Sequence, residues 1–291
     1  MSRARPTTVA ALLDAPFRLV RRDLKLLAPW GVAVGITSAL PSMLQQVTLA
    51  ALGGMSGMAD KPAALVVWAV LANATALTGV GLYLVGQFVL YTAVFRRVQG
   101  LDLPIMTVLK GALDWRLWVI GILEALINMA GLLLCGLPQL YLMPVLLPSM
   151  AIALHEDTHA GAIKRCFELV HHRSAEVRGL GTWGRAVALL HAMTFVTMAL
   201  STLSSGPTLI VMTVRIWRSL SDGTFDPDMM QDLAMLPVWA QVPLSLLGGA
   251  VTGLALLYSI AARFTLYEDL RDTREGVDLA EALDAAEAAG A

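Results

Sequence analysis

The sequence contains few charged residues: 15% of its 291 residues are Asp, Glu, Lys or Arg, whereas 57% are hydrophobic. A soluble domain usually has about 25% charged residues and about 45–50% apolar residues. A globule of this size has too much surface to hide such an apolar excess from water. The composition therefore excludes an ordinary soluble domain and favours an integral membrane protein.

Other absences narrow the classes of function. The formal net charge is −1, so the chain has no basic surplus that would favour binding to nucleic acid. Its two cysteines, Cys135 and Cys166, provide neither a disulfide framework nor a thiolate zinc site. A Gly-rich phosphate loop and a nucleophile elbow are also lacking. We predict a protein with no catalytic activity of its own and no cofactor.

Long stretches with almost no charge predict six transmembrane spans, because about 20 apolar residues cross a bilayer. The stretch 117–154 has Glu124 as its one charged residue, but it is too long for a single span. We therefore divide it at Gly136 and Pro138. The first apolar run is too long for a signal peptide, and we expect it to be retained. The predicted spans are 26–55, 62–95, 117–136, 138–154, 186–214 and 233–262.

The distribution of Lys and Arg predicts the orientation of these spans. All but three of the 21 Lys and Arg residues fall on one side of the membrane in this topology. The exceptions are Lys61, Arg215 and Arg218. Since positive charges stay in the cytoplasm, we predict that both termini are cytoplasmic. The expected parts are a cytoplasmic amphipathic segment (1–25), a six-span transmembrane domain (26–266) and an acidic cytoplasmic tail (267–291).

Three basic segments next to spans place their apolar residues at the spacing of one helical face: Val9–Leu27, Ile105–Leu117 and Ala162–Val170. A basic amphipathic helix beside a span lies flat at the lipid headgroups. The predicted fold is an all-α membrane protein with six transmembrane helices as three hairpins, each preceded by an interfacial amphipathic helix. The predicted partners are the bilayer, through its anionic headgroups, and a protein at the cytoplasmic face.

Two stretches carry a resemblance to a known family. One is Leu266-Tyr267-Glu268-Asp269-Leu270-Arg271, followed by Arg274-Glu275-Gly276-Val277-Asp278-Leu279. The other runs from Pro148 to Leu169, where a proline-containing span ends at Glu156 and a helix with Ala162, Arg165 and Leu169 follows. Over roughly residues 10–280, the chain resembles the bacterial integral membrane domain named for some glycerophosphodiester phosphodiesterases.

This resemblance implies a six-span bundle with short cytoplasmic helices in the bacterial inner (cytoplasmic) membrane. The family usually has an Arg-Ser pair where this chain has Arg165-Cys166. Some members are fused to a soluble phosphodiesterase domain that has no counterpart in this sequence, so its catalytic activity does not carry over. Many stand-alone members resemble this chain, and their biochemical role is largely undefined.

The segment from His155 to His159 matches the pattern His-Glu-x-x-His. On one helix, His155 and His159 could bind zinc and Glu156 could act as the general base of a metalloprotease. However, Asp157 is charged where the pattern normally has an uncharged residue, and Asp157 or Thr158 would make a good N-cap for the next helix. A helix boundary there would separate the two histidines. A membrane zinc protease is therefore the second alternative function.

Polar side chains inside the spans need partners because lipid offers none. Glu124, Asn128 and His191 lie at similar predicted depths, and a hydrogen bond between Glu124 and His191 is a plausible pairing. They could form the polar site of a transporter or permease component, which is the first alternative. A buried structural clamp is the preferred interpretation. The predicted function is that of a non-catalytic membrane domain with an organising role, or one that binds a partner or lipid.

Two small-residue motifs would allow another helix to approach closely, although such spacing is common by chance in Gly-rich spans. These are Gly31-x-x-x-Gly35 in the first predicted span and Gly249-x-x-x-Gly253 in the last. Glycines four residues apart lie on one face of a helix and let another backbone approach closely.

Overall fold

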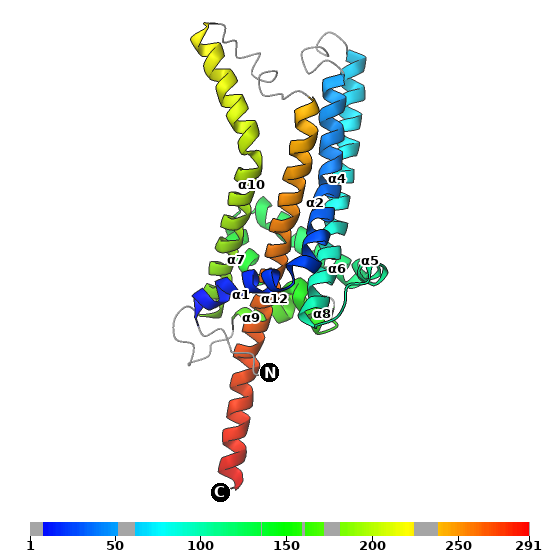
Figure 1. The fold of residues 1–291 in the computed structure, drawn as a ribbon. Helices are drawn as coiled ribbons and strands as arrows, with labels where there is room; N and C mark the ends of the chain where they lie inside the picture. The colour runs from blue at the N-terminus through cyan, green and yellow to red at the C-terminus, as the bar shows by residue number, and fades with distance from the viewer. Residues whose placement is uncertain are drawn as a thin grey trace. The chain divides into compact units, whose positions relative to one another are not determined.

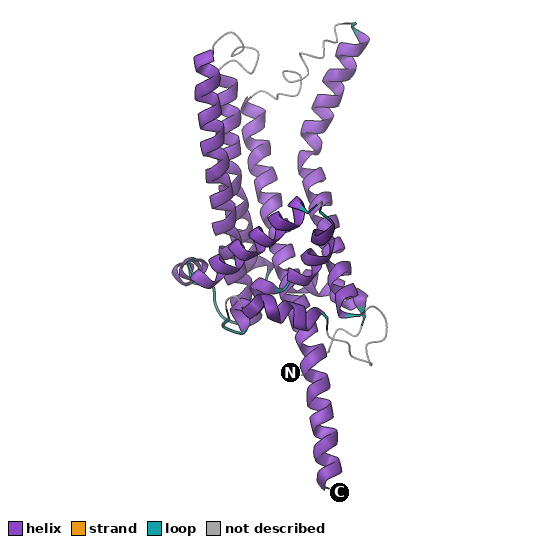
Figure 2. Cartoon of the chain, turned by 180° about the vertical axis from the view of Figure 1, so that it is seen from behind, coloured by secondary structure: helices purple, strands orange, loops and turns teal. Residues whose placement is uncertain are grey.

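The computed structural model describes residues 8–51, 62–134, 136–158, 161–171, 181–223 and 238–290. All regular structure in these ranges is helical (Figure 2). Within these ranges, six helical segments are long and apolar enough to cross a membrane, which confirms the predicted all-α class with six candidate spans. They are Leu24–Leu49, Pro62–Val98, Trp115–Leu133, Leu137–His155, Thr182–Ser204 and Val242–Arg274.

The described helices differ widely in length, and their order along the chain can be followed in Figure 1. The described helices are α1 (Val9–Arg22), α2 (Leu24–Ala51), α4 (Pro62–Val98), α5 (Ile105–Ala112), α6 (Trp115–Leu133), α7 (Leu137–Leu146), α8 (Ser149–His155), α9 (Gly161–Val170), α10 (Thr182–Ser221) and α12 (Val238–Gly290).

The predicted division after the third span is confirmed. Helix α6 ends at Leu133, and α7 begins after Gly136, whose φ of 74° lies in the left-handed region that glycine adopts without strain. A further break separates α7 from α8 at Pro148, because proline has no backbone N–H to continue the helical ladder. The predicted ends of the first span, 52–55, and of the last, 233–237, lie outside the described residues.

The sequence places a boundary between 266 and 267, but α12 continues through it without a break. Tyr267 and Asp269 are each only 1% exposed, and Leu270 is fully buried. These first residues of the expected acidic tail therefore belong to the packed part of the protein. Burial of Asp269 is possible because an arginine pairs with it, as described below.

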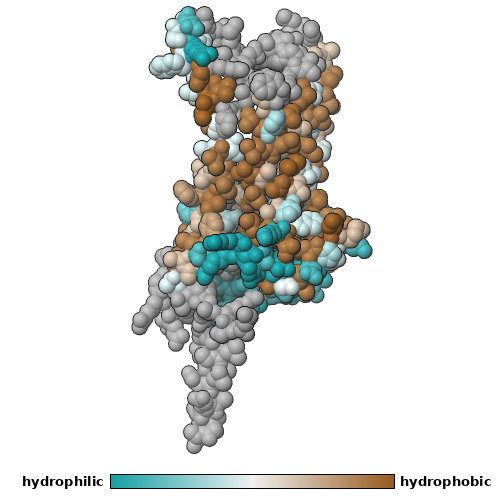
Figure 3. Space-filling model, viewed as in Figure 1, coloured by the Kyte–Doolittle hydropathy of each residue, from teal (hydrophilic) through white to brown (hydrophobic). Residues whose placement is uncertain are grey.

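The chain forms two compact units. Unit 1 contains Met1–Leu27, Phe88–Val196 and Leu257–Ala291, and unit 2 contains Ala28–Gln87 and Thr197–Leu256. All the short helices fall in unit 1. Figure 3 shows hydrophobic residues over the long helices of unit 2, and hydrophilic residues gathered over α1 of unit 1.

In unit 2, the two glycine motifs face each other and bring the backbones of α2 and α12 into contact. A methyl group on Gly31 would lie 3.2 Å from the carbonyl oxygen of Gly253, and one on Gly249 would lie 2.7 Å from that of Gly35. The second distance is too short for any side chain. The close helix approach that such motifs allow therefore occurs, although the sequence did not indicate that the two motifs meet each other.

In unit 1, local capping sets the ends of α1. The Thr8 hydroxyl accepts a hydrogen bond of 3.2 Å from the Ala11 amide, which fixes the start of the helix. The helix ends at Arg22 because Asp23 leaves helical geometry, so α1 covers only part of the predicted amphipathic segment Val9–Leu27. Leu12 of α1, Ile152 of α8 and Leu169 of α9 lie completely inside the unit.

Candidate functional site

The segment with the zinc-protease pattern does not form one continuous helix. Helix α8 ends at His155, Glu156 follows as its C-cap, and Asp157 has a left-handed φ of 55°. Two histidines can share a helical face only if the helix continues between them, and here it ends at the first. His159 itself lies outside the described residues. In the part of the chain that is described, no three His, Cys, Asp or Glu side chains are grouped to hold a metal ion.

His155 instead packs among aromatic rings. Its imidazole lies 4.9 Å from the ring of Phe95, 4.9 Å from that of Tyr267 and 5.7 Å from that of Phe264, measured between centroids. Its Nδ1 lies 3.1 Å from the carbonyl oxygen of Ala151. The histidine therefore helps to pack α4, α8 and α12 against one another.

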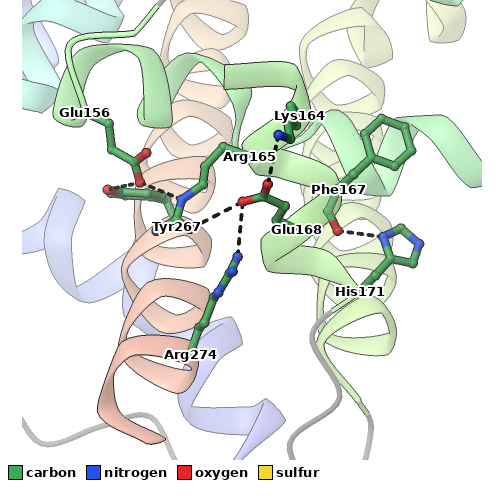
Figure 4. Close-up of polar contacts among 8 residues, drawn as sticks. All are labelled: Glu156, Lys164, Arg165, Phe167, Glu168, His171, Tyr267 and Arg274. Carbon is green, nitrogen blue, oxygen red and sulfur yellow. Dashed lines mark hydrogen bonds and ion pairs between the residues drawn. The ribbon is translucent and has the colours of Figure 1, made fainter. Parts of the chain in front are cut away.

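Glu156 receives two hydrogen bonds on one carboxylate oxygen. Arg165 Nε donates at 3.1 Å, and the Tyr267 hydroxyl donates at 3.2 Å (Figure 4). These contacts bring together the two stretches on which the family resemblance was based; Glu156 and Tyr267 are 111 residues apart. The Glu156 carboxylate, the expected general base of the protease alternative, is thus engaged in holding α9 and α12.

A second acidic residue continues this network on α9. Glu168 lies 3.3 Å from Arg274 of α12 and 3.6 Å from Arg165, and Figure 4 shows its carboxylate between these cations and Lys164. Lys164 is 3.9 Å away and largely exposed to solvent. Alternating charges of this kind neutralise one another and join α9 to α12.

Arg185 and Asp269 form a buried ion pair that the sequence reading missed. One guanidinium nitrogen of Arg185 donates to both carboxylate oxygens, at 2.9 and 2.8 Å, and the Asp269 side chain has no exposure to solvent. One turn earlier on α10, the Thr182 hydroxyl donates a 2.6 Å hydrogen bond to the Val170 carbonyl at the end of α9. Nothing in the sequence indicates that residues 84 positions apart meet. The only signal is that Arg185 immediately precedes a charge-free stretch.

The candidate intramembrane site is only partly assembled. Glu124 of α6 accepts a hydrogen bond from the Ser149 hydroxyl of α8, and Arg263 of α12 lies 3.8 Å from its other oxygen. The Arg263 guanidinium also stands 5.9 Å from the centre of the Tyr91 ring. Helices α4, α6, α8 and α12 therefore meet around one carboxylate.

The other two members of that candidate site do not join Glu124. His191, whose position is described, is exposed and lies 2.8 Å from the Val187 carbonyl of its own helix, so its suggested hydrogen bond to Glu124 is wrong. Asn128 lies one turn beyond Glu124, and its side-chain oxygen is buried without a hydrogen-bond partner. Similar depth in two spans did not determine which faces of the helices meet.

A third buried charge lies where α1 ends. Asp23 accepts a 2.7 Å hydrogen bond from Arg97 of α4, and a 2.8 Å hydrogen bond from Arg22. Burial acts to raise the pKa of Asp23, but the hydrogen bonds from Arg97 and Arg22 outweigh it and hold that pKa below its usual value. The pair fixes the end of α1 to the end of α4.

Helices α1, α5 and α9, which lie in the three predicted amphipathic segments, differ in the residues that they leave exposed. Helix α1 exposes Phe17 beside the cations Arg18, Arg21 and Arg22. Helix α5 exposes several large apolar residues and Lys110, whereas α9 exposes Lys164 but buries most of its apolar residues.

Comparisons with protein-family models, with curated proteins and with solved structures found no match to the chain. The family resemblance therefore stays a prediction, and function has to be inferred from the contacts and surfaces described above.

Proposed function

We propose that the chain is a non-catalytic integral membrane domain that organises lipid, with a preference for anionic headgroups, at the cytoplasmic face of a bacterial inner membrane. In this proposal its six spans form three hairpins, and the short helices α1, α5 and α9 precede them at the membrane surface. A cytosolic protein is a further partner. Both termini are cytoplasmic.

The proposal rests on a contrast between buried and exposed charges in unit 1. The buried charges of Asp23, Arg185 and Asp269 are already neutralised by protein partners. In contrast, Arg21 and Lys25 are exposed, three and one residues from Leu24, which is also exposed. In a lipid, the phosphate lies next to the acyl chains. A cation next to an apolar side chain can therefore contact both parts of an anionic lipid.

The proposal can be tested with the protein in nanodiscs of phosphatidylcholine mixed with phosphatidylglycerol. Spin-labelled analogues of the two lipids report how strongly the protein immobilises each one. We expect a preference for phosphatidylglycerol that falls with rising salt, because charges at the surface are screened. Equal immobilisation of both lipids would contradict the proposal.

Two variants with opposite effects on charge make this test specific. Replacing Arg21 and Lys25 together by Gln should weaken the preference. Asp14→Asn should strengthen it, since Asp14 is exposed and neutralises Arg18 at 3.0 Å. Damage to the fold would shift both variants in the same direction, so opposite shifts identify an electrostatic cause.

The two alternatives have separate readouts. A transporter with a polar site at Glu124 requires water to reach that carboxylate, which now contacts Ser149 and Arg263. A zinc protease using His155, His159 and Glu156 requires one zinc per purified chain, lost on replacement of either histidine. Neither alternative has a specific contact in its favour.

A further inference from the structure

Helix α5 has a broad apolar face that none of the described residues covers. Ile105 is 65% exposed, Met106 66%, Leu109 42% and Leu113, which follows the last residue of the helix, 69%. These positions lie on one side of the helix. Exposed apolar patches of this kind mark contact with another molecule or with lipid.

The opposite side of the same helix is firmly packed. Val108 is fully buried, and Ala112 is 2% exposed. Gly111 lies so close to the Thr92 side chain of α4 that no β-carbon would fit between them. The free face of α5 is therefore held outward by contacts on its back.

The link that leads into α5 is also fixed. Arg96 donates a 2.8 Å hydrogen bond to the Asp102 carbonyl, and Arg97 donates a 3.0 Å hydrogen bond to the Leu101 carbonyl. Pro104 then occupies the N-cap position, with the extended backbone that precedes a helix. The orientation of α5 is thus determined by several independent contacts.

The position of α5 indicates lipid as the occupant of this face. The helix lies between α4, which ends at Val98, and α6, which begins at Trp115, and both are candidate membrane spans. Figure 1 shows α5 at the edge of unit 1, near α6. Trp115 is itself more than half exposed, and tryptophan is enriched where acyl chains meet headgroups.

The charge on α5 agrees with this occupant. Lys110 is exposed, and it is the one charged residue of α5. A long lysine side chain can follow apolar surface and place its ammonium group at the phosphate level. Because a single cation accompanies so many apolar side chains, the apolar contact dominates.

We infer that the free face of α5 inserts among the acyl chains of one leaflet, with Lys110 at the phosphates, and that this helix responds to acyl-chain packing rather than to headgroup charge. The inference rests on the proposed lipid-organising function and assigns α5 a separate part in it. Helix α1, with its several arginines, responds to headgroup charge.

Spin labels placed along α5 test the insertion. Cys135→Ala provides the background, and the remaining thiol, Cys166, is buried, which raises its pKa and keeps it unreactive toward the label. Labels at Ile105→Cys, Met106→Cys and Leu109→Cys should be reached by oxygen, which dissolves in acyl chains, and shielded from a water-soluble nickel complex. A label at Lys110→Cys should show a several-fold lower ratio of oxygen to nickel accessibility.

Either of two results would overturn the inference. Free access of the nickel complex to all four labels would place α5 in water. Spin–spin broadening between labels on different chains would show that a second copy covers the face. Neither measurement needs a protein partner. The Cys135→Ala protein without an added cysteine, treated with the same label, reports any reaction at Cys166.

Lipid composition then separates this inference from the proposed function. Replacing dimyristoyl by dioleoyl lipids loosens the acyl packing. The labels at positions 105, 106 and 109 should then lie deeper in the bilayer, with a higher ratio of oxygen to nickel accessibility. Added phosphatidylglycerol should leave that ratio unchanged. No response to packing would contradict the inference but leave the anionic-lipid preference standing. A packing response without that preference would contradict the proposed function alone.

Discussion

Helices α5 and α9 have similar patterns of apolar residues and one exposed lysine each, but they face different surroundings. On α9, Ala162, Cys166, Leu169 and Val170 are all buried against other helices of unit 1. On α5, Val108 and Ala112 are buried, whereas Ile105, Met106 and Leu109 are exposed. The same periodicity can thus provide a protein core or a lipid contact, and the neighbouring helices decide which.

The charges around these two helices show the same division. Near α9, the acidic and basic side chains pair with each other: Glu156 with Arg165, Glu168 with Arg274, and Arg185 with Asp269. On α5, Lys110 points to the outside. Variants that disturb α9 should therefore weaken the fold, whereas those on α5 should act on its contact with lipid.

The largest effect is expected from Asp269→Ala, which leaves the buried Arg185 without its carboxylate. Removal of one partner of a buried ion pair typically costs about 3–5 kcal/mol of stability. Chemical unfolding in detergent should show this loss. Replacing Arg185 and Asp269 together by Leu should restore much of the stability, and a double variant as unstable as Asp269→Ala would contradict the assigned role.

A matched pair of leucines compares the two helices directly. Leu169→Ala on α9 opens a cavity at a fully buried position and should cost about 2–5 kcal/mol. Leu109→Ala on α5 should cost less than about 0.5 kcal/mol in detergent, because its side chain is already exposed. Equal shifts in the unfolding midpoint would show that α5 is also part of the core.

Asp23→Asn tests the intermediate case, α1, through its dependence on pH. Hydrogen bonds to a charged group contribute about 1.5–3 kcal/mol each, so the variant should be less stable at pH 7. Because the pKa of Asp23 is lowered in the folded state, this contribution is complete above the unfolded pKa of about 3.9 and is lost as the pH falls through the folded value. The stability difference between wild type and variant should therefore shrink below pH about 4. A difference that is constant with pH would exclude the charge as its cause.

The smallest effect is expected from Glu168→Gln. Its ion pairs with Arg165 and Arg274 are partly open to solvent, and such pairs usually contribute less than about 1 kcal/mol. The loss should fall further in high salt, which can be followed by unfolding at two ionic strengths. An effect as large as that of Asp269→Ala would mean that the network acts as one buried unit.

The sequence predicted the parts of the fold that depend on local chemistry. The break at Gly136 and the extent of α9 follow from short-range patterns. The pairing of Arg185 with Asp269 could not be predicted, because it depends on how distant helices rotate about their own axes. The expected contact between Glu124 and His191 was wrong for the same reason: matching depths do not fix which sides of two helices face each other.

The glycine contact between α2 and α12 also restricts passage through unit 2. A β-carbon at Gly249 would already overlap the opposite backbone, so no methylene of a fatty acyl chain can slip between the two helices there. Water is excluded from that contact for the same reason. Along these two glycine motifs, α2 and α12 are therefore sealed against each other, and neither lipid nor water can pass between them at that level.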